Sequence, residues 1–221
     1  MTGPDPLNYF WWLASRSAGL VAFTLLTAVT VLGLLSALRV AGPRTARALR
    51  PWHERLALAA LACIGAHGLL LLLDGYLKPG LTGILVPFTM SYRPLWTGLG
   101  IVGAYVIFAL SLSFYARRRI GASRWHNAHR LAPVGFVLVF LHVLMAGTDA
   151  RTVWLLAMAV GAMLAVGLLL GLRIAQEPRA PGRPQTATRV SVASASASAS
   201  ASQPQPVAAA SRARRDRDRL W

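Results

Sequence analysis

The chain reads HERLALAALACIGAHGLLLLL from His53 to Leu73. After its first three residues the stretch is apolar, over close to the roughly 20 residues that a helix needs to cross a bilayer. One histidine opens it, and a second, His67, follows 14 positions later. Ionisable side chains are costly at membrane depth and mark functional sites by default. The stretch therefore predicts a membrane-spanning helix with a functional group at each of two depths.

Four further apolar stretches predict five spans in all. Apolar residues make up 55% of the 221 residues and charged residues 14%, whereas a soluble domain carries roughly 25% charged residues. Cys63 is the single cysteine, so the chain alone forms no internal disulfide and no iron–sulfur cluster. The fold class is an all-α membrane protein, a bundle of five transmembrane helices. We place the spans at residues 13–38, 55–73, 95–115, 131–146 and 153–172, the fourth also using residues from His126 or His129 onward.

The chain divides into a membrane domain, residues 1–174, and a tail, residues 175–221. The tail is rich in Ala, Ser, Pro and Arg, which predicts disorder because it has too little apolar surface to offset chain entropy. The net charge of +16 would indicate nucleic acid in a soluble protein. Here the arginines lie between apolar blocks, so we expect a lipid bilayer as the partner and no nucleic acid.

The basic residues also predict orientation, because cytoplasmic loops carry an excess of Lys and Arg. Three segments hold 19 of the 23 basic residues: the first connection with Arg55, the third connection with Arg130, and the C-terminal segment from Arg173 to Arg219. The opposite side holds the other four: Arg16, Lys78, Arg93 and Arg151. We therefore expect a multi-pass plasma-membrane protein with its N-terminus outside and its C-terminus in the cytoplasm.

The other histidines, His126, His129 and His142, belong to the fourth span, which runs parallel to the second. The rise from His53 to His67 is about 21 Å and that from His129 to His142 about 20 Å, at 1.5 Å per residue. His53 should therefore lie level with His129, and His67 with His142. Imidazoles that face each other across a helix bundle are axial ligands for haem iron. Two haems with irons about 20 Å apart would result; for any single histidine the alternative is a hydrogen bond between helices.

Two points stay open at the level of sequence. Thirteen residues turn an ideal helix so that His142 points about 140° away from His129, and a kink at Pro133 is expected to correct this. His126 is a substitute ligand, a partner for a haem propionate or a plain interfacial residue. Arg16, Arg55 and Arg130 are candidates to bind propionates, with snorkelling to lipid headgroups as the alternative.

The chain resembles the ferric reductase-like transmembrane domain family, which includes ferric reductases, NADPH oxidases and the haem subunit of the methionine sulfoxide reductase system. The resemblance covers about residues 9–172 and is that of a short, actinobacterial-type member. It rests on the two histidine spacings and on these segments: SRSAGLVA from Ser15, WHNAHRL from Trp125, DGY from Asp74, LVPF from Leu85 and AGTD from Ala146. It implies bis-histidine b-type haems on His53, His67, His129 and His142.

The resemblance also implies electron transfer through the membrane, between a cytoplasmic-side and an outer-side redox partner. Only 47 residues follow position 174, without a GxGxxG motif, and five spans are expected where many family members have six. We therefore expect an electron-transfer subunit of an oxidoreductase without its own flavin and NAD(P)H domain, served by a separate protein, flavin or quinone. Outer-sphere transfer requires no catalytic residue. The alternatives are a redox-inactive haem- or lipid-binding scaffold, and a small transporter with histidine proton relays.

Overall fold

The computed structural model describes residues 6–38, 42–149 and 152–176, and over these residues the chain is helical without a strand. Five segments are long and apolar enough to cross a membrane, with α5 and α6 together making the fourth. The all-α class with five membrane-spanning segments is therefore confirmed. The predicted disorder of the tail beyond Gln176 lies outside the described residues. The helices are α1 (Pro6–Ala37), α2 (Gly42–Leu72), α3 (Gly80–Leu85), α4 (Pro94–Ile120), α5 (Ala122–His129), α6 (Ala132–Ala146) and α7 (Val153–Ala175).

The helix ends follow local backbone chemistry and extend beyond the apolar stretches. Proline in the first turn, where its missing N–H has no partner to lose, starts α4 at Pro94. Gly121 ends the same helix with φ +94°, a conformation that glycine adopts without strain. The short helix α3 in the connection between α2 and α4 was not predicted.

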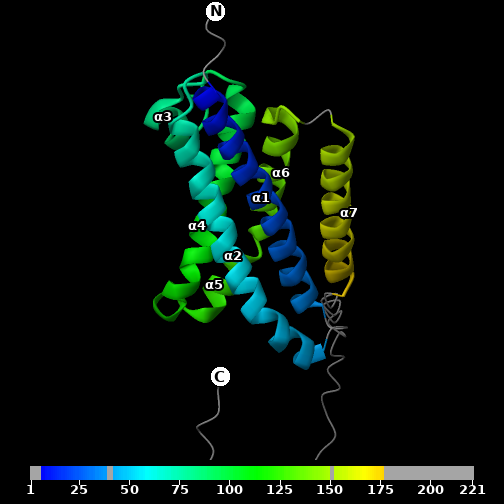
Figure 1. The fold of residues 1–221 in the computed structure, drawn as a ribbon. Helices are drawn as coiled ribbons and strands as arrows, with labels where there is room; N and C mark the ends of the chain where they lie inside the picture. The colour runs from blue at the N-terminus through cyan, green and yellow to red at the C-terminus, as the bar shows by residue number, and fades with distance from the viewer. Residues whose placement is uncertain (1–5, 39–41, 150–151, 177–221) are drawn as a thin grey trace, which may run out of the picture. The chain divides into compact units, whose positions relative to one another are not determined.

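Four helices surround the centre of the bundle. Packed neighbours are α1 with α2, α2 with α4, α4 with α6, and α6 with α1, so that α2 and α6 take diagonal positions. Helix α7 packs mainly on α1, and Figure 1 shows it on the flank of the bundle. Helix α3 lies at the same end as the start of α1, and α5 lies at the opposite end (Figure 1). We call these the α3 end and the basic end, because Arg117, Arg118 and Arg119 close α4 at the latter.

An aromatic cluster fills the core between the two ends of the bundle. Phe136 of α6 is fully buried and stacks on Phe23 of α1, with ring centroids 6.1 Å apart. Phe140 contacts both rings, at 6.4 Å from each. Phe136 lies between His129 and His142 along the chain, so an apolar layer separates the depths of these two histidines.

The fourth span is broken, which resolves the problem of the 13-residue spacing. Helix α5 ends at His129 and α6 begins at Ala132. Pro133 has no N–H for the carbonyl of His129, and the chain passes the gap with three-residue turns from Leu131 to Ala128 and from Val134 to Leu131. His129 and His142 thus belong to different helices, and the ideal-helix angle between them no longer applies.

Candidate functional site

The four histidines of the second and fourth spans meet in two pairs. The ring centroids of His53 and His129 are 6.2 Å apart, with an angle of 78° between the ring planes. The centroids of His67 and His142 are 6.4 Å apart, with an angle of 71°. These are the pairs that equal depth on parallel spans predicts. We call His53–His129 the basic-end pair and His67–His142 the α3-end pair.

The distance between the rings can be tested against a shared metal ion. A bond from a first-row metal to an imidazole nitrogen is about 2.0–2.1 Å long, and the ring centroid lies about 1.1 Å behind that nitrogen. Two imidazoles on opposite sides of one ion therefore have centroids roughly 6.3 Å apart. Both pairs match this separation within 0.1 Å or so.

Two of the imidazoles are oriented by backbone carbonyls of neighbouring helices. Nδ1 of His53 lies 3.0 Å from the carbonyl oxygen of Val29 in α1. Nδ1 of His142 lies 2.9 Å from that of Trp96 in α4. A carbonyl oxygen only accepts, so Nδ1 carries the proton in both rings and donates it. Nε2 is then the nitrogen with a free lone pair, as a metal ligand requires.

His67 is held by both groups of one residue, Ser15. Its Nδ1 lies 2.8 Å from the Ser15 carbonyl oxygen and 3.1 Å from Ser15 Oγ. The Ser15 hydroxyl donates to the backbone oxygen of His67 at 2.9 Å, so its lone pairs are free to accept from Nδ1. Ser15 is 1% exposed. The sequence alone did not indicate a role for this side chain.

His129 differs from the other three imidazoles. Its Nδ1 is buried and has no hydrogen-bond partner among the described residues. The ring instead stacks on Trp125, one turn earlier in α5, with centroids 5.0 Å apart and an angle of 23°. The indole N–H of Trp125 is also buried without an acceptor in the described part of the chain. A buried donor without an acceptor calls for a partner of another kind, and the carboxylate of a haem propionate is an acceptor that fits an indole N–H.

Of the three arginines that the sequence offers for propionates, one has a protein partner and two are exposed. Arg16 forms a two-point ion pair with Asp149, which lies in the connection after α6. Its guanidinium also lies over the Trp12 ring, at 4.8 Å from the ring centroid. Its guanidinium therefore has a protein partner, which the sequence did not predict. Arg55 and Arg130 are exposed near the basic-end pair in sequence, and Arg55 lies over the Trp52 ring.

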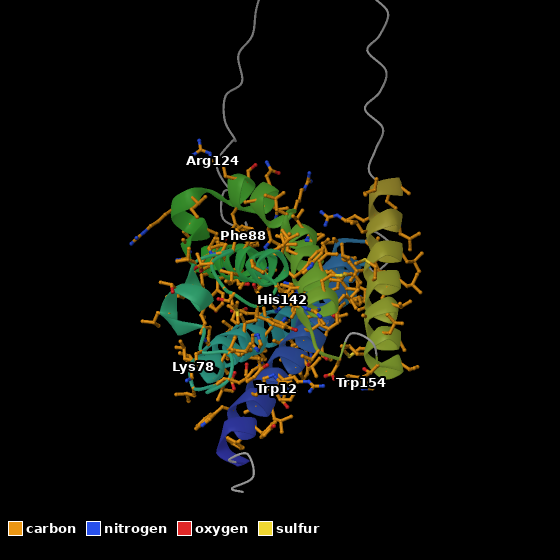
Figure 2. All side chains as sticks on the ribbon, turned by 90° about the horizontal axis from the view of Figure 1, so that it is seen from above. Trp12, Lys78, Phe88, Arg124, His142 and Trp154 are labelled. Atoms are coloured by element: carbon orange, nitrogen blue, oxygen red, sulfur yellow. The ribbon has the colours of Figure 1, made fainter. Side chains whose placement is uncertain are left out.

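His126 stays outside both pairs. Its side chain is exposed, and its ring contacts Trp125 edge-on at 5.8 Å. Figure 2 shows His142, by contrast, in the interior of the bundle, with Lys78 and Arg124 at the periphery. Among the described residues no group of three or more His, Cys, Asp or Glu side chains is placed to hold a metal ion. The candidate site thus consists of two histidine pairs.

No family model, curated protein or solved structure matches this chain.

Proposed function

We propose that this protein is a membrane cytochrome b that carries electrons across the bilayer through two bis-histidine haems. The carrying observation is the pairing of four imidazoles at the separation expected for a shared metal ion. A haem suits such a pair because the macrocycle supplies four ligands of its own and leaves two axial positions. Bound there, it supplies one-electron redox chemistry. The resemblance to the ferric reductase-like family supports the same conclusion.

The chain's own residues would perform three tasks. The two histidine pairs, His53–His129 and His67–His142, would each hold one haem iron. Carbonyls of α1 and α4 keep the proton on Nδ1 and leave Nε2 for the metal. The buried indole N–H of Trp125, together with Arg55 and Arg130, offers donors and positive charge for propionates at the basic end.

The aromatic layer between the pairs favours electron transfer over proton transport. Phe23 and Phe136 are 1% and 0% exposed, and their rings stack across the bundle between the two depths. A proton relay requires an unbroken chain of hydrogen-bonded groups, whereas electrons tunnel through packed apolar matter. A transporter with histidine relays is therefore the weaker alternative.

The proposed orientation follows the distribution of basic residues. The basic end, with three arginines in the last turn of α4, would face the cytoplasm. The α3 end would face outward and give the electrons to, or take them from, an external partner. Donor and acceptor would be separate molecules, of the protein, flavin or quinone class, and the membrane would be the plasma membrane.

The decisive experiment is the haem content of the purified chain. A pyridine haemochrome assay against protein concentration should give two haems b per chain, and a redox titration should show a reducible b-type spectrum. A ratio near one would remove one pair from the proposal. A colourless protein that is folded, and stays colourless after expression with added haem, would overturn the proposal altogether.

A further inference from the structure

Three glycines lie directly against three of the paired histidines. A Cβ at Gly19 would be 3.0 Å from His67 Nδ1, and a Cβ at Gly33 would be 3.1 Å from His53 Cε1. A Cβ at Gly100 would be 2.5 Å from the ring of His142, well inside van der Waals contact. No side chain at these positions would leave the rings where they are.

Each of these glycines stands four residues after the carbonyl that accepts from the same histidine. The relation holds for Ser15 and Gly19 at His67, for Val29 and Gly33 at His53, and for Trp96 and Gly100 at His142. In an α-helix the side chain of a residue covers the turn before its own Cα. The carbonyl of residue i is already bonded to the N–H of residue i+4. Where residue i+4 is a glycine, no Cβ stands between this carbonyl and an imidazole ring of the neighbouring helix.

The spacing on α1 matches the spacing on α2. Gly19 and Gly33 are 14 residues apart, as are His53 and His67. Helix α1 packs along α2 and runs in the opposite direction, so that the later glycine meets the earlier histidine. Helix α1 thus has an accessible backbone carbonyl at each of the two depths at which α2 carries an imidazole.

We infer that Gly19, Gly33 and Gly100 are positioning residues for the haem ligands: each opens a helix carbonyl that fixes the proton of one imidazole on Nδ1 and the plane of its ring. This rests on the proposed function, since it describes how the same two sites are prepared. His129 lies outside this scheme, because it stacks on Trp125 and its Nδ1 has no acceptor among the described residues. The two sites therefore differ. At the α3 end both imidazoles donate from Nδ1 to a backbone carbonyl, and at the basic end only that of His53 does.

The hydrogen bonds from Nδ1 to these carbonyls should affect the properties of a bound haem as well as the packing of the helices. A ligated imidazole that donates from Nδ1 is more basic and favours the oxidised metal. The angle between the two ring planes, 78° or 71° here, governs the g-anisotropy of a low-spin ferric haem. Ring orientation and Nδ1 hydrogen bonding are thus readable by electron paramagnetic resonance and by midpoint potential.

The test compares Gly19→Ala, Gly33→Ala and Gly100→Ala with Gly161→Ala, whose Cβ would meet nothing within 4 Å. Gly100→Ala should lower the haem ratio from two toward one. Gly19→Ala should alter the low-spin signal of the same haem, and Gly33→Ala that of the other haem, with the mildest effect. Gly161→Ala should leave ratio and signals unchanged.

A variant without added volume separates positioning from crowding. Ser15→Ala removes the hydroxyl acceptor of His67. It should keep two haems and shift the midpoint potential of the haem that Gly19→Ala disturbs to a higher value, because the imidazole becomes less basic. If Gly19→Ala or Gly100→Ala fails to fold, Gly33→Ala decides the matter, because its Cβ would make the longest of the three approaches to an imidazole.

The outcomes separate the inference from the function on which it rests. A wild-type protein without haem would overturn both. A wild-type protein with two haems, together with unchanged signals and potentials in Gly19→Ala and Gly33→Ala, would overturn the inference alone. Equal effects of Gly161→Ala and Gly100→Ala would also overturn it, because they would show a general packing defect.

Discussion

His67 and His142 face each other with their ring centroids 6.4 Å apart, although 75 positions separate them in the chain. Each ring is held from behind, His67 by Ser15 of α1 and His142 by the Trp96 carbonyl of α4. Nδ1 of each ring is thus engaged in a hydrogen bond, which leaves Nε2 as the nitrogen with a free lone pair. This arrangement predicts which two histidines hold the same haem.

Replacing each paired histidine by alanine should remove one haem, and the partner's replacement should remove the same one. His67→Ala and His142→Ala should delete one wave of a redox titration, because a single imidazole holds the iron poorly. His53→Ala and His129→Ala should delete the other. His126→Ala is the control and should keep both waves. Loss of a wave in His126→Ala with retention in His129→Ala would contradict the pairing.

The ion pair between Arg16 and Asp149 should stabilise the α3 end by joining the first span to the connection that follows the fourth span. Its side chains are 29% and 13% exposed, so solvent screens it in part. We expect a coupling energy of about 1–2 kcal/mol in a double-mutant cycle with Arg16→Gln and Asp149→Asn, measured from thermal unfolding in detergent. Additive effects of the two substitutions would show that the pair contributes no net stability.

Gly98 and Gly167 should respond oppositely to alanine. A Cβ at Gly98 would overlap the ring of Phe88, which is itself fixed by a left-handed backbone at φ +68°. Gly98→Ala should therefore destabilise the protein by about 1–3 kcal/mol through overpacking. A Cβ at Gly167 meets nothing within 4 Å, so Gly167→Ala should be neutral or stabilising by up to about 1 kcal/mol. Thermal unfolding of the two variants in the same detergent measures the contrast.

The proposed orientation is testable because Cys63 is the chain's only cysteine. In a Cys63→Ser background, Lys78→Cys should react with a membrane-impermeant maleimide on intact cells, since it lies at the α3 end. Arg119→Cys, at the basic end of α4, should react only after permeabilisation. The reverse labelling pattern would place the basic end outside.

Truncation after Ala175 should leave the haem spectrum unchanged. Residues 176–221 contain no histidine and no apolar stretch long enough to cross a membrane. The absorption spectrum and haem ratio of the truncated protein, compared with the full chain, measure this. A truncated protein that inserts at normal levels and loses haem would show that the tail supports the sites.

The sequence predicted well what depends on position along a helix axis. Spans follow from apolar length, and the depth of His53 relative to His129 follows from rise per residue and span direction. The same reasoning left the angles around the helix axis open. It left Arg16 as a candidate for a haem propionate or for snorkelling, and it did not predict the ion pair with Asp149 that the structure shows. The ligand roles of the four histidines stay predictions.

Hydropathy and helical rise are one-dimensional properties, so the sequence by itself determined five spans, their all-α class and two levels of histidine. Only the tertiary structure decided which faces meet. The break between α5 and α6 at Pro133 turns His142 toward His67. Only the tertiary structure shows that glycines of α1 and α4 lie against imidazoles of other helices. The physical reason is that rotation about a helix axis and the choice of neighbour are set by packing among all the helices together, which no single stretch of sequence contains.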